Sequence, residues 1–149
     1  MNTATISFNH NITNEKRLTF DALRRANTAR LPQFKNAQGE IAHSKEDGSD
    51  WTPADWMTAV VGELGEAANI MKKIKRGDFG NRGEDNAQYW EALGKLAKEF
   101  ADVIIYMDLL AMQYGLTLDS AVANKFNETS RKVGADVFLS GGEAVQIPL

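Results

Sequence analysis

The sequence predicts an all-α protein, a bundle of about four helices with two long central ones. Apolar residues recur at helical spacing in four segments, and helix-start and helix-stop residues bracket these segments. No set of alternating strands suggests a sheet core. At 149 residues the chain is expected to form one domain over 1–149, with a flexible N-terminal segment (1–18) and a C-terminal tail (135–149).

The first helix is expected over 20–30. Thr19 can cap its free amides, and Pro32 follows just past its end. The next stretch, 33–50, has no apolar period and is predicted to be a surface loop, with His43 exposed to solvent.

The second helix has the strongest start signal in the chain. Thr52 supplies a hydroxyl cap, and Pro53 suits the first helical position because that position needs no N–H partner. We expect a helix over about 53–75, which Gly77 ends. The glycine-rich stretch 77–86 is then a connector between antiparallel helices, since it does not match a Walker-type phosphate loop.

The third helix is expected over 87–114, with an interruption near Gly94 and an end at Gly115. Residues 96–112 are apolar on nearly every side, which is typical of a central, buried helix. So much apolar helix surface in a small chain also suggests homo-oligomerisation.

The fourth helix is expected over 118–132, from Thr117 to Gly134. The tail, 135–149, contains two short apolar stretches separated by two glycines. It is predicted to be a small strand or an arm that reaches a partner subunit.

Composition narrows the possible environments and partners. A net charge of -3 argues against a nucleic-acid partner. No apolar run is long enough for a membrane span, and the start of the chain lacks a signal-peptide pattern. The absence of cysteine fits a reducing cytoplasm. We therefore expect a cytoplasmic protein without membrane or nucleic-acid partners.

Four acids in two clusters are the most informative feature of the chain. Glu63 and Glu66 lie three residues apart in the second helix, and Glu99 and Asp102 lie three apart in the third. Large apolar residues share their faces, so these carboxylates are expected to point toward the core. Buried carboxylates need pairing, protonation or a metal, and hard divalent ions such as Mg²⁺ prefer oxygen ligands. The alternative is pairing of these acids with nearby lysines: Lys72, Lys73, Lys95 and Lys98.

At these residues the chain resembles the MazG-like branch of the all-α nucleoside triphosphate pyrophosphohydrolases. That family carries Glu-x-x-Glu on one helix and Glu-x-x-Asp on the next. The similar stretches are 62–69, 99–106, 125–128 and 23–27 with Arg30. The resemblance covers roughly residues 19–134. One departure is Thr129, at a position where many members have asparagine.

The resemblance implies hydrolysis of a nucleoside triphosphate, with a purine deoxynucleotide (dGTP or dATP) favoured, to the monophosphate and pyrophosphate. It also implies two or three Mg²⁺ or Mn²⁺ ions, a homodimer or homotetramer, and a bacterial cell or phage-infected host. The residues carried over are the metal ligands Glu63, Glu66, Glu99 and Asp102, and the substrate-binding residues Lys125, Asn127, Tyr106, Asn27 and Arg30. Glu66 is the candidate to accept a proton from the attacking water.

Several alternatives stay open on the sequence alone. A pyrimidine-specific enzyme acting on dUTP or dCTP is one, and an inactive, metal-binding interaction module is another. A di-iron carboxylate bundle is disfavoured because neither acid cluster has a nearby histidine. The aromatic residues that could stack on a base, or simply pack in the core, are Trp51, Trp56, Trp90, Phe34 and Phe79.

Overall fold

The computed structural model describes residues 18–43, 50–140 and 143–146, and it confirms an all-α fold with two long central helices. The elements in chain order are α1 (Phe20–Arg30), the 3₁₀ turn η1 (Leu31–Gln33), α2 (Pro53–Arg76), α3 (Ala87–Gln113), α4 (Leu118–Val133), β1 (Val137–Ser140) and β2 (Glu143–Gln146). The expected flexibility of segment 1–18 concerns residues that lie almost entirely outside the described ranges.

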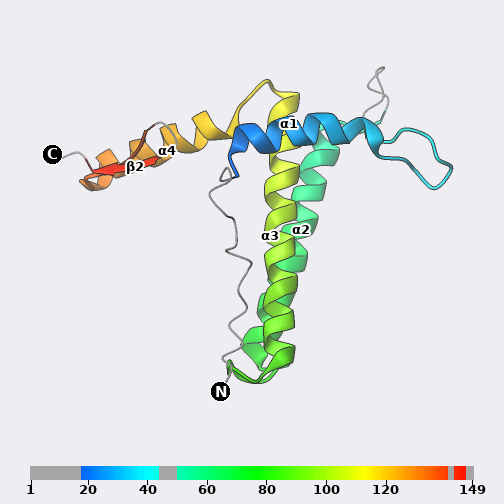
Figure 1. The fold of residues 1–149 in the computed structure, drawn as a ribbon, viewed down its shortest axis with the longest axis vertical. Coiled ribbons are helices and arrows are strands. Elements are labelled where there is room, and N and C mark those ends of the chain that lie inside the picture. Colours follow the sequence, from blue (N-terminus) through cyan, green and yellow to red (C-terminus); the bar gives the residue numbers. More distant parts are fainter. Residues whose placement is uncertain (1–17, 44–49, 141–142, 147–149) are drawn as a thin grey trace.

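The antiparallel pair α2 and α3 forms the long axis of the molecule (Figure 1). A reciprocal capping box between Thr52 and Asp55 starts α2, and Gly77 ends it with a left-handed φ of 80°. The helix α3 runs without interruption through Gly94, so the predicted break there is wrong. A single glycine weakens a helix interior by only about 1 kcal/mol, and packing against α2 outweighs that cost.

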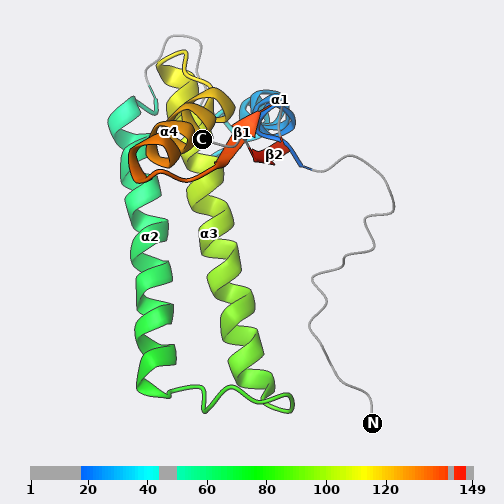
Figure 2. The same cartoon turned by 90° about the vertical axis from the view of Figure 1, so that its left-hand side faces the viewer.

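The helix α1 crosses α3 near the open end of this hairpin, and α4 leaves from the same end (Figures 1 and 2). An ion pair fixes the crossing: Arg24 Nη2 lies 2.9 Å from Asp108 Oδ1. Arg24 Nη2 also donates to the carbonyl of Leu116 at 2.9 Å, at the connection into α4. One arginine thus joins α1, α3 and the start of α4.

The tail forms a two-stranded antiparallel hairpin, β1 with β2, which packs along α4. The Asn127 amide holds it there, because it donates to the Leu139 carbonyl at 2.9 Å and accepts from the Leu139 N–H at 2.7 Å. The expectation of a small strand in the tail is therefore confirmed.

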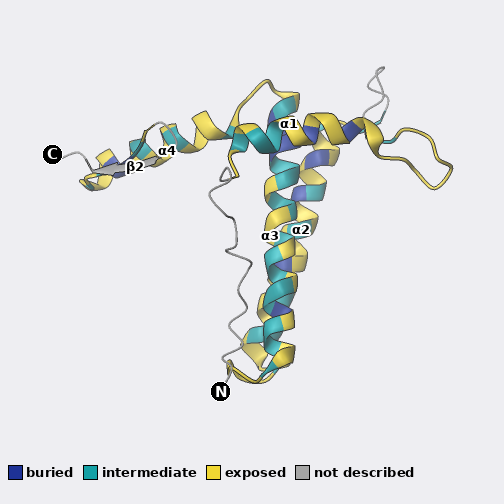
Figure 3. Cartoon of the chain, in the orientation of Figure 1, coloured by how far each residue is buried: buried dark blue, intermediate teal, exposed yellow. Residues whose placement is uncertain are grey.

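The core is narrow and lies between the long helices and beneath α1 (Figure 3). Its fully buried side chains include Trp56 and Val60 of α2 and Leu109 of α3. The prediction that residues 96–112 are buried on all sides is wrong for a single chain, since Phe100 and Ile104 keep 47% and 45% of their surface exposed. Neighbouring elements of the same chain cover only part of the circumference of α3.

Among the described residues, no single helix is both long and apolar enough to cross a membrane. Within the same described ranges, one pair of helices, α3 with α4, meets that length and composition together, and a bend of 102° separates the two.

Candidate metal centre and adjoining pocket

Three of the four predicted acids come together between the two long helices. Glu63 of α2 meets Glu99 and Asp102 of α3, and one carboxylate oxygen of each lies within 4.8 Å of the others. All three side chains are half-buried. Helix geometry explains the grouping, because residues three apart share a face and that face of each helix is turned toward the other. Glu66 lies outside this triad, with its side chain exposed.

The triad concentrates negative charge. Burial raises the pKa of Glu63 above its ordinary value, and a side-chain hydrogen bond with Glu99 and the charges of Asp102, Glu66 and Glu99 raise it further. Burial also raises the pKa of the nearby Tyr106 hydroxyl, together with the charges of Glu63 and Asp102. Glu63 therefore holds its proton more tightly than an isolated glutamate does, and a bound cation would oppose this upward shift of its pKa.

The lysine alternative finds no support in the described part of the chain. None of the three triad carboxylates forms an ion pair there with a lysine or arginine, whereas Lys95 pairs with Glu91 at 2.8 Å. Three convergent carboxylates without a cation are a donor set that suits a hard divalent ion. The triad could hold a metal ion, and its chemistry fits the group that the sequence suggests.

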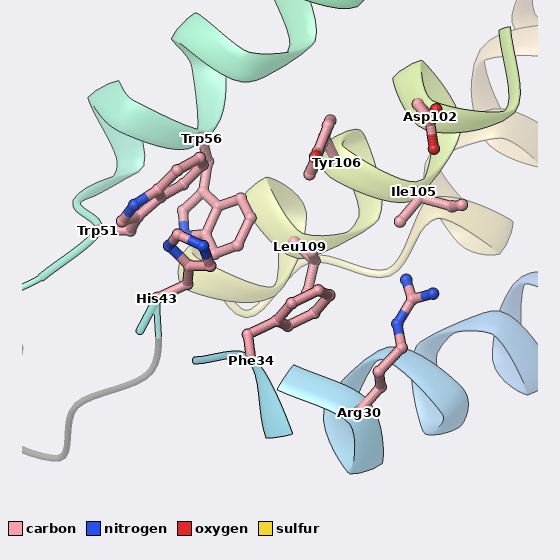
Figure 4. Close-up of a pocket in the computed structure, with 9 residues that line it drawn as sticks. All are labelled: Arg30, Phe34, His43, Trp51, Trp56, Asp102, Ile105, Tyr106 and Leu109. Atoms are coloured by element: carbon pink, nitrogen blue, oxygen red, sulfur yellow. The ribbon is translucent and has the colours of Figure 1, made fainter. Parts of the chain in front are cut away.

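A pocket of about 230 Å³ adjoins the triad and shares Asp102 with it. It is lined by Arg30, Phe34, His43, Trp51, Trp56, Asp102, Ile105, Tyr106 and Leu109. Figure 4 shows the tryptophans and His43 at one end of the pocket, with Asp102 and Arg30 at the other. An aromatic end and a charged end thus belong to the same cavity.

The aromatic end is built from residues on both sides of the 44–49 segment. The His43 ring meets Trp51 edge-on at 4.3 Å between centroids, and Trp51 lies 4.5 Å from Trp56. His43 is half-buried, so the prediction that it is exposed to solvent is wrong. Its Nδ1 and the Trp56 Nε1 are buried, and neither has a hydrogen-bond partner among the described residues.

The charged end contains two of the predicted substrate residues, Arg30 and Tyr106. Asn27, a third, is 2% exposed and does not line the pocket. It lies behind Arg30, whose Nη2 donates to the Asn27 Oδ1 at 3.2 Å. Asn27 is thus placed to orient Arg30 and not to meet a ligand directly.

The two remaining predicted residues are on α4, and the structure does not bring them to the pocket. Lys125 is exposed and pairs with Glu128 at 2.8 Å, one turn along the same helix. The Asn127 amide is occupied by the backbone of Leu139. Within one chain, neither Lys125 nor Asn127 therefore lines the pocket beside the triad.

Of the five aromatic residues predicted as candidates for base stacking, some line the pocket and others do not. Phe34, Trp51 and Trp56 line the pocket, whereas Trp90 and Phe79 belong to the turn at the opposite end of the α2–α3 hairpin. There the Trp90 Nε1 donates to the Gly83 carbonyl at 2.9 Å, so Trp90 has a structural role.

Two residues that shape the pocket or its surroundings, His43 and Asp108, were not predicted from the sequence. His43 gave no periodic signal, since it lies in an irregular stretch. Asp108 was visible only as a lone acid in an apolar helix, and its buried position beneath α1 depends on the tertiary crossing.

Comparisons with known proteins identify no relative: no family model matches this chain, and no curated protein matches its sequence.

Proposed function

We propose that this protein is a metal-dependent nucleoside triphosphate pyrophosphohydrolase that releases a monophosphate and pyrophosphate. The observation that carries the proposal is the position of Asp102, which belongs both to the acid triad and to the aromatic pocket. A base held among aromatic rings would place its phosphates beside the carboxylates.

The acids are assigned the metal-binding role. Glu63, Glu99 and Asp102 would hold Mg²⁺ or Mn²⁺, with Glu66 completing a site of two or three ions. Such ions neutralise phosphate charge and lower the pKa of a bound water. Glu66 is exposed and close enough for its charge to affect Glu63, so it is the candidate to accept the proton of the attacking water. Arg30 would meet the phosphate oxygens from the opposite wall.

A purine deoxynucleotide, dGTP or dATP, is our preferred substrate. Trp51 is half-buried and lines the pocket, and stacking on an aromatic ring stabilises a base by about 1–3 kcal/mol. The buried N–H of Trp56 is free among the described residues to donate to a ring nitrogen or a keto oxygen. A pyrimidine triphosphate offers fewer ring atoms to the same walls.

We further propose that the active form is a homodimer or homotetramer. Exposed apolar residues follow one stripe of α2 at spacings of three, four and seven, and α3 carries a second stripe. These residues are Met57, Val61, Leu64 and Met71 on α2, with Phe100 and Ile104 on α3. Apolar stripes at this spacing are typical of helices that pack against further helices.

Product analysis tests the proposed activity. Each purine and pyrimidine deoxynucleoside triphosphate is incubated with the protein and Mn²⁺, and the products are separated by ion-exchange chromatography. We expect the monophosphate and pyrophosphate in equal amounts, fastest with a purine. Orthophosphate without pyrophosphate, or no turnover of any nucleotide, would contradict the proposal. The same assay on Asp102→Asn, which keeps the side-chain shape, separates this activity from a contaminating enzyme.

A further inference from the structure

A buried carboxylate that the triad does not use lies on the side of α3 facing α1. Asp108 is only 1% exposed. Its Oδ1 accepts from Arg24 Nε at 3.0 Å, and its Oδ2 accepts from Asn27 Nδ2 at 2.9 Å. A buried charge is tolerated only when it is paired and hydrogen-bonded, so both α1 residues are held firmly against it.

The amide of Asn27 has one permitted orientation between its neighbours. A carboxylate only accepts hydrogen bonds, so the amide nitrogen must face Asp108. The same nitrogen lies 3.5 Å from the Ile105 carbonyl, a second acceptor. The amide oxygen therefore faces Arg30, whose guanidinium only donates, and the Nη2 to Oδ1 distance is 3.2 Å.

Without its hydrogen bond to Asn27, the Arg30 side chain would be mobile. It is the last residue of α1, its side chain is exposed, and it forms no ion pair among the described residues. Its Cζ lies 5.6 Å from the Phe34 ring centroid, a weak contact at this exposure. Figure 4 shows its guanidinium pointing into the pocket, toward the side that Asp102 occupies.

From this geometry we infer that Asp108, acting through Asn27, is a positioning element that holds the Arg30 guanidinium ready for the phosphate oxygens of a triphosphate. The identity of that anion rests on the proposed function, whereas the positioning does not. A side chain fixed in its binding orientation before the ligand arrives does not lose its rotamer freedom on binding. Asn27 and Asp108 thus assist a ligand that neither of them touches.

The positioning can be measured in the ligand-free protein. We expect Asn27→Ala to lower the ¹⁵N relaxation order parameter of the Arg30 Nε–H clearly below its wild-type value. Thr28→Ala is the matched control, because Thr28 is the next residue of α1 and its hydroxyl donates to the Arg24 carbonyl at 2.9 Å and to Met112 Sδ at 3.6 Å, not to Arg30. An unchanged Arg30 order parameter in Asn27→Ala overturns the inference. If Asn27→Ala does not fold, Asn27→Ser is measured instead, with the same two outcomes.

A double-mutant cycle tests the consequence for the reaction. Loss of a hydrogen bond to a charged group predicts about a tenfold lower kcat/KM in Asn27→Ala. In an Arg30→Ala background, Asn27→Ala should cause no further loss, since its effect passes through Arg30. Equal losses in both backgrounds would make Asn27 merely structural and overturn the inference. Absence of turnover in the wild type would instead reject the proposed function, and the relaxation measurement would still decide the positioning.

Discussion

At the scale of single residues, the central feature is a group of carboxylates that have no ion-pair partner within the described ranges. Glu63, Glu99 and Asp102 converge in a half-buried position, and the pKa of Glu63 is raised mainly by burial. A protein folded without metal therefore carries repulsion that a divalent ion would relieve. The adjoining aromatic rings give the same site a second, uncharged surface.

Glu63→Gln should make the metal-free protein more stable at pH 7. The folded-state pKa of Glu63 lies above its ordinary value of 4.5, so the folded chain binds the proton more tightly than the unfolded chain. Its contribution to the free energy of unfolding consequently falls as pH rises from the unfolded pKa to the folded one, and the penalty persists at neutral pH. Urea unfolding in EDTA measures the free energy of unfolding of both proteins.

Mn²⁺ should stabilise the wild type and leave Glu63→Gln nearly unaffected. Binding to the folded state alone adds about 2.7 kcal/mol at a metal concentration 100 times the Kd. Glu91→Gln is the matched control on α3. Lys95 lowers the pKa of Glu91, so Glu91→Gln should decrease the free energy of unfolding at pH 7, opposite in sign to Glu63→Gln. The stabilisation of Glu91→Gln by Mn²⁺ should stay intact. An equal Mn²⁺ response in all three proteins would remove the triad as the metal site.

Trp51→Ala should weaken nucleotide binding by about 1–3 kcal/mol, the usual contribution of one stacked base. We expect a raised KM with a smaller change in kcat, because the proposal places the Trp51 ring against the base and not against the phosphates. Trp90→Ala is the control, since Trp90 lies at the far turn of the hairpin. Equal effects of both substitutions on KM would place the base elsewhere.

The residue types of the site could be predicted, but not all of their neighbours. Helical periodicity places three acids on apolar helix faces, and this pattern identifies them as candidate ligands from the sequence: Glu63, Glu99 and Asp102. The resemblance assigned Asn27 to the nucleotide pocket, whereas its amide nitrogen donates to Asp108. Pairing across 81 residues of sequence depends on the crossing of α1 over α3, which local patterns do not specify.

At the scale of elements, the helix boundaries could be predicted where the sequence contains a capping residue. Thr19, Thr52 and Gly134 mark helix ends within one residue of their predicted positions. The stretch after α1 was less predictable. It forms η1 and a short bridge between Lys35 and Ile41, and so brings Phe34 and His43 to the pocket. Such a path depends on contacts with α2 and α3 and leaves no periodic trace in the sequence.

Asn127→Ala should loosen the tail hairpin from α4. The substitution removes two hydrogen bonds to Leu139, each of which contributes about 0.5–1.5 kcal/mol. Amide hydrogen exchange of β1 should accelerate while that of α2 stays unchanged. Lys125→Ala, two residues away on α4, removes an ion pair with Glu128 and should leave the β1 exchange rates unaltered. Slow β1 exchange in Asn127→Ala would show that other contacts hold the hairpin.

At the scale of the whole molecule, a single chain leaves much of the apolar surface of its two long helices exposed. Apolar stripes remain exposed on α2 and α3, and α4 projects away from them (Figure 1). The resemblance assigns Lys125 a phosphate contact, yet α4 does not line the pocket of its own chain. If that role holds, a neighbouring subunit must supply the lysine, which again favours an oligomer.

Leu64→Glu should dissociate the oligomer, because Leu64 is 47% exposed in the middle of the α2 stripe. Burying an unpaired charge in an apolar interface costs several kcal/mol. Sedimentation velocity should show a monomer, while wild type sediments as a dimer or tetramer. Asn69→Glu adds the same charge on another exposed side of α2 and should keep the wild-type mass. A monomeric wild type at micromolar concentration would contradict the oligomer proposal.

The most direct measurement of the central claim is anomalous diffraction at the manganese edge. Crystals grown with Mn²⁺ and a non-hydrolysable deoxynucleoside triphosphate analogue would supply it. We expect anomalous peaks about 2.0–2.3 Å from carboxylate oxygens of Glu63, Glu99 and Asp102, as is usual for hard divalent ions, with the base at the aromatic end of the pocket. Manganese bound elsewhere, with the triad empty and the analogue outside the pocket, would contradict it.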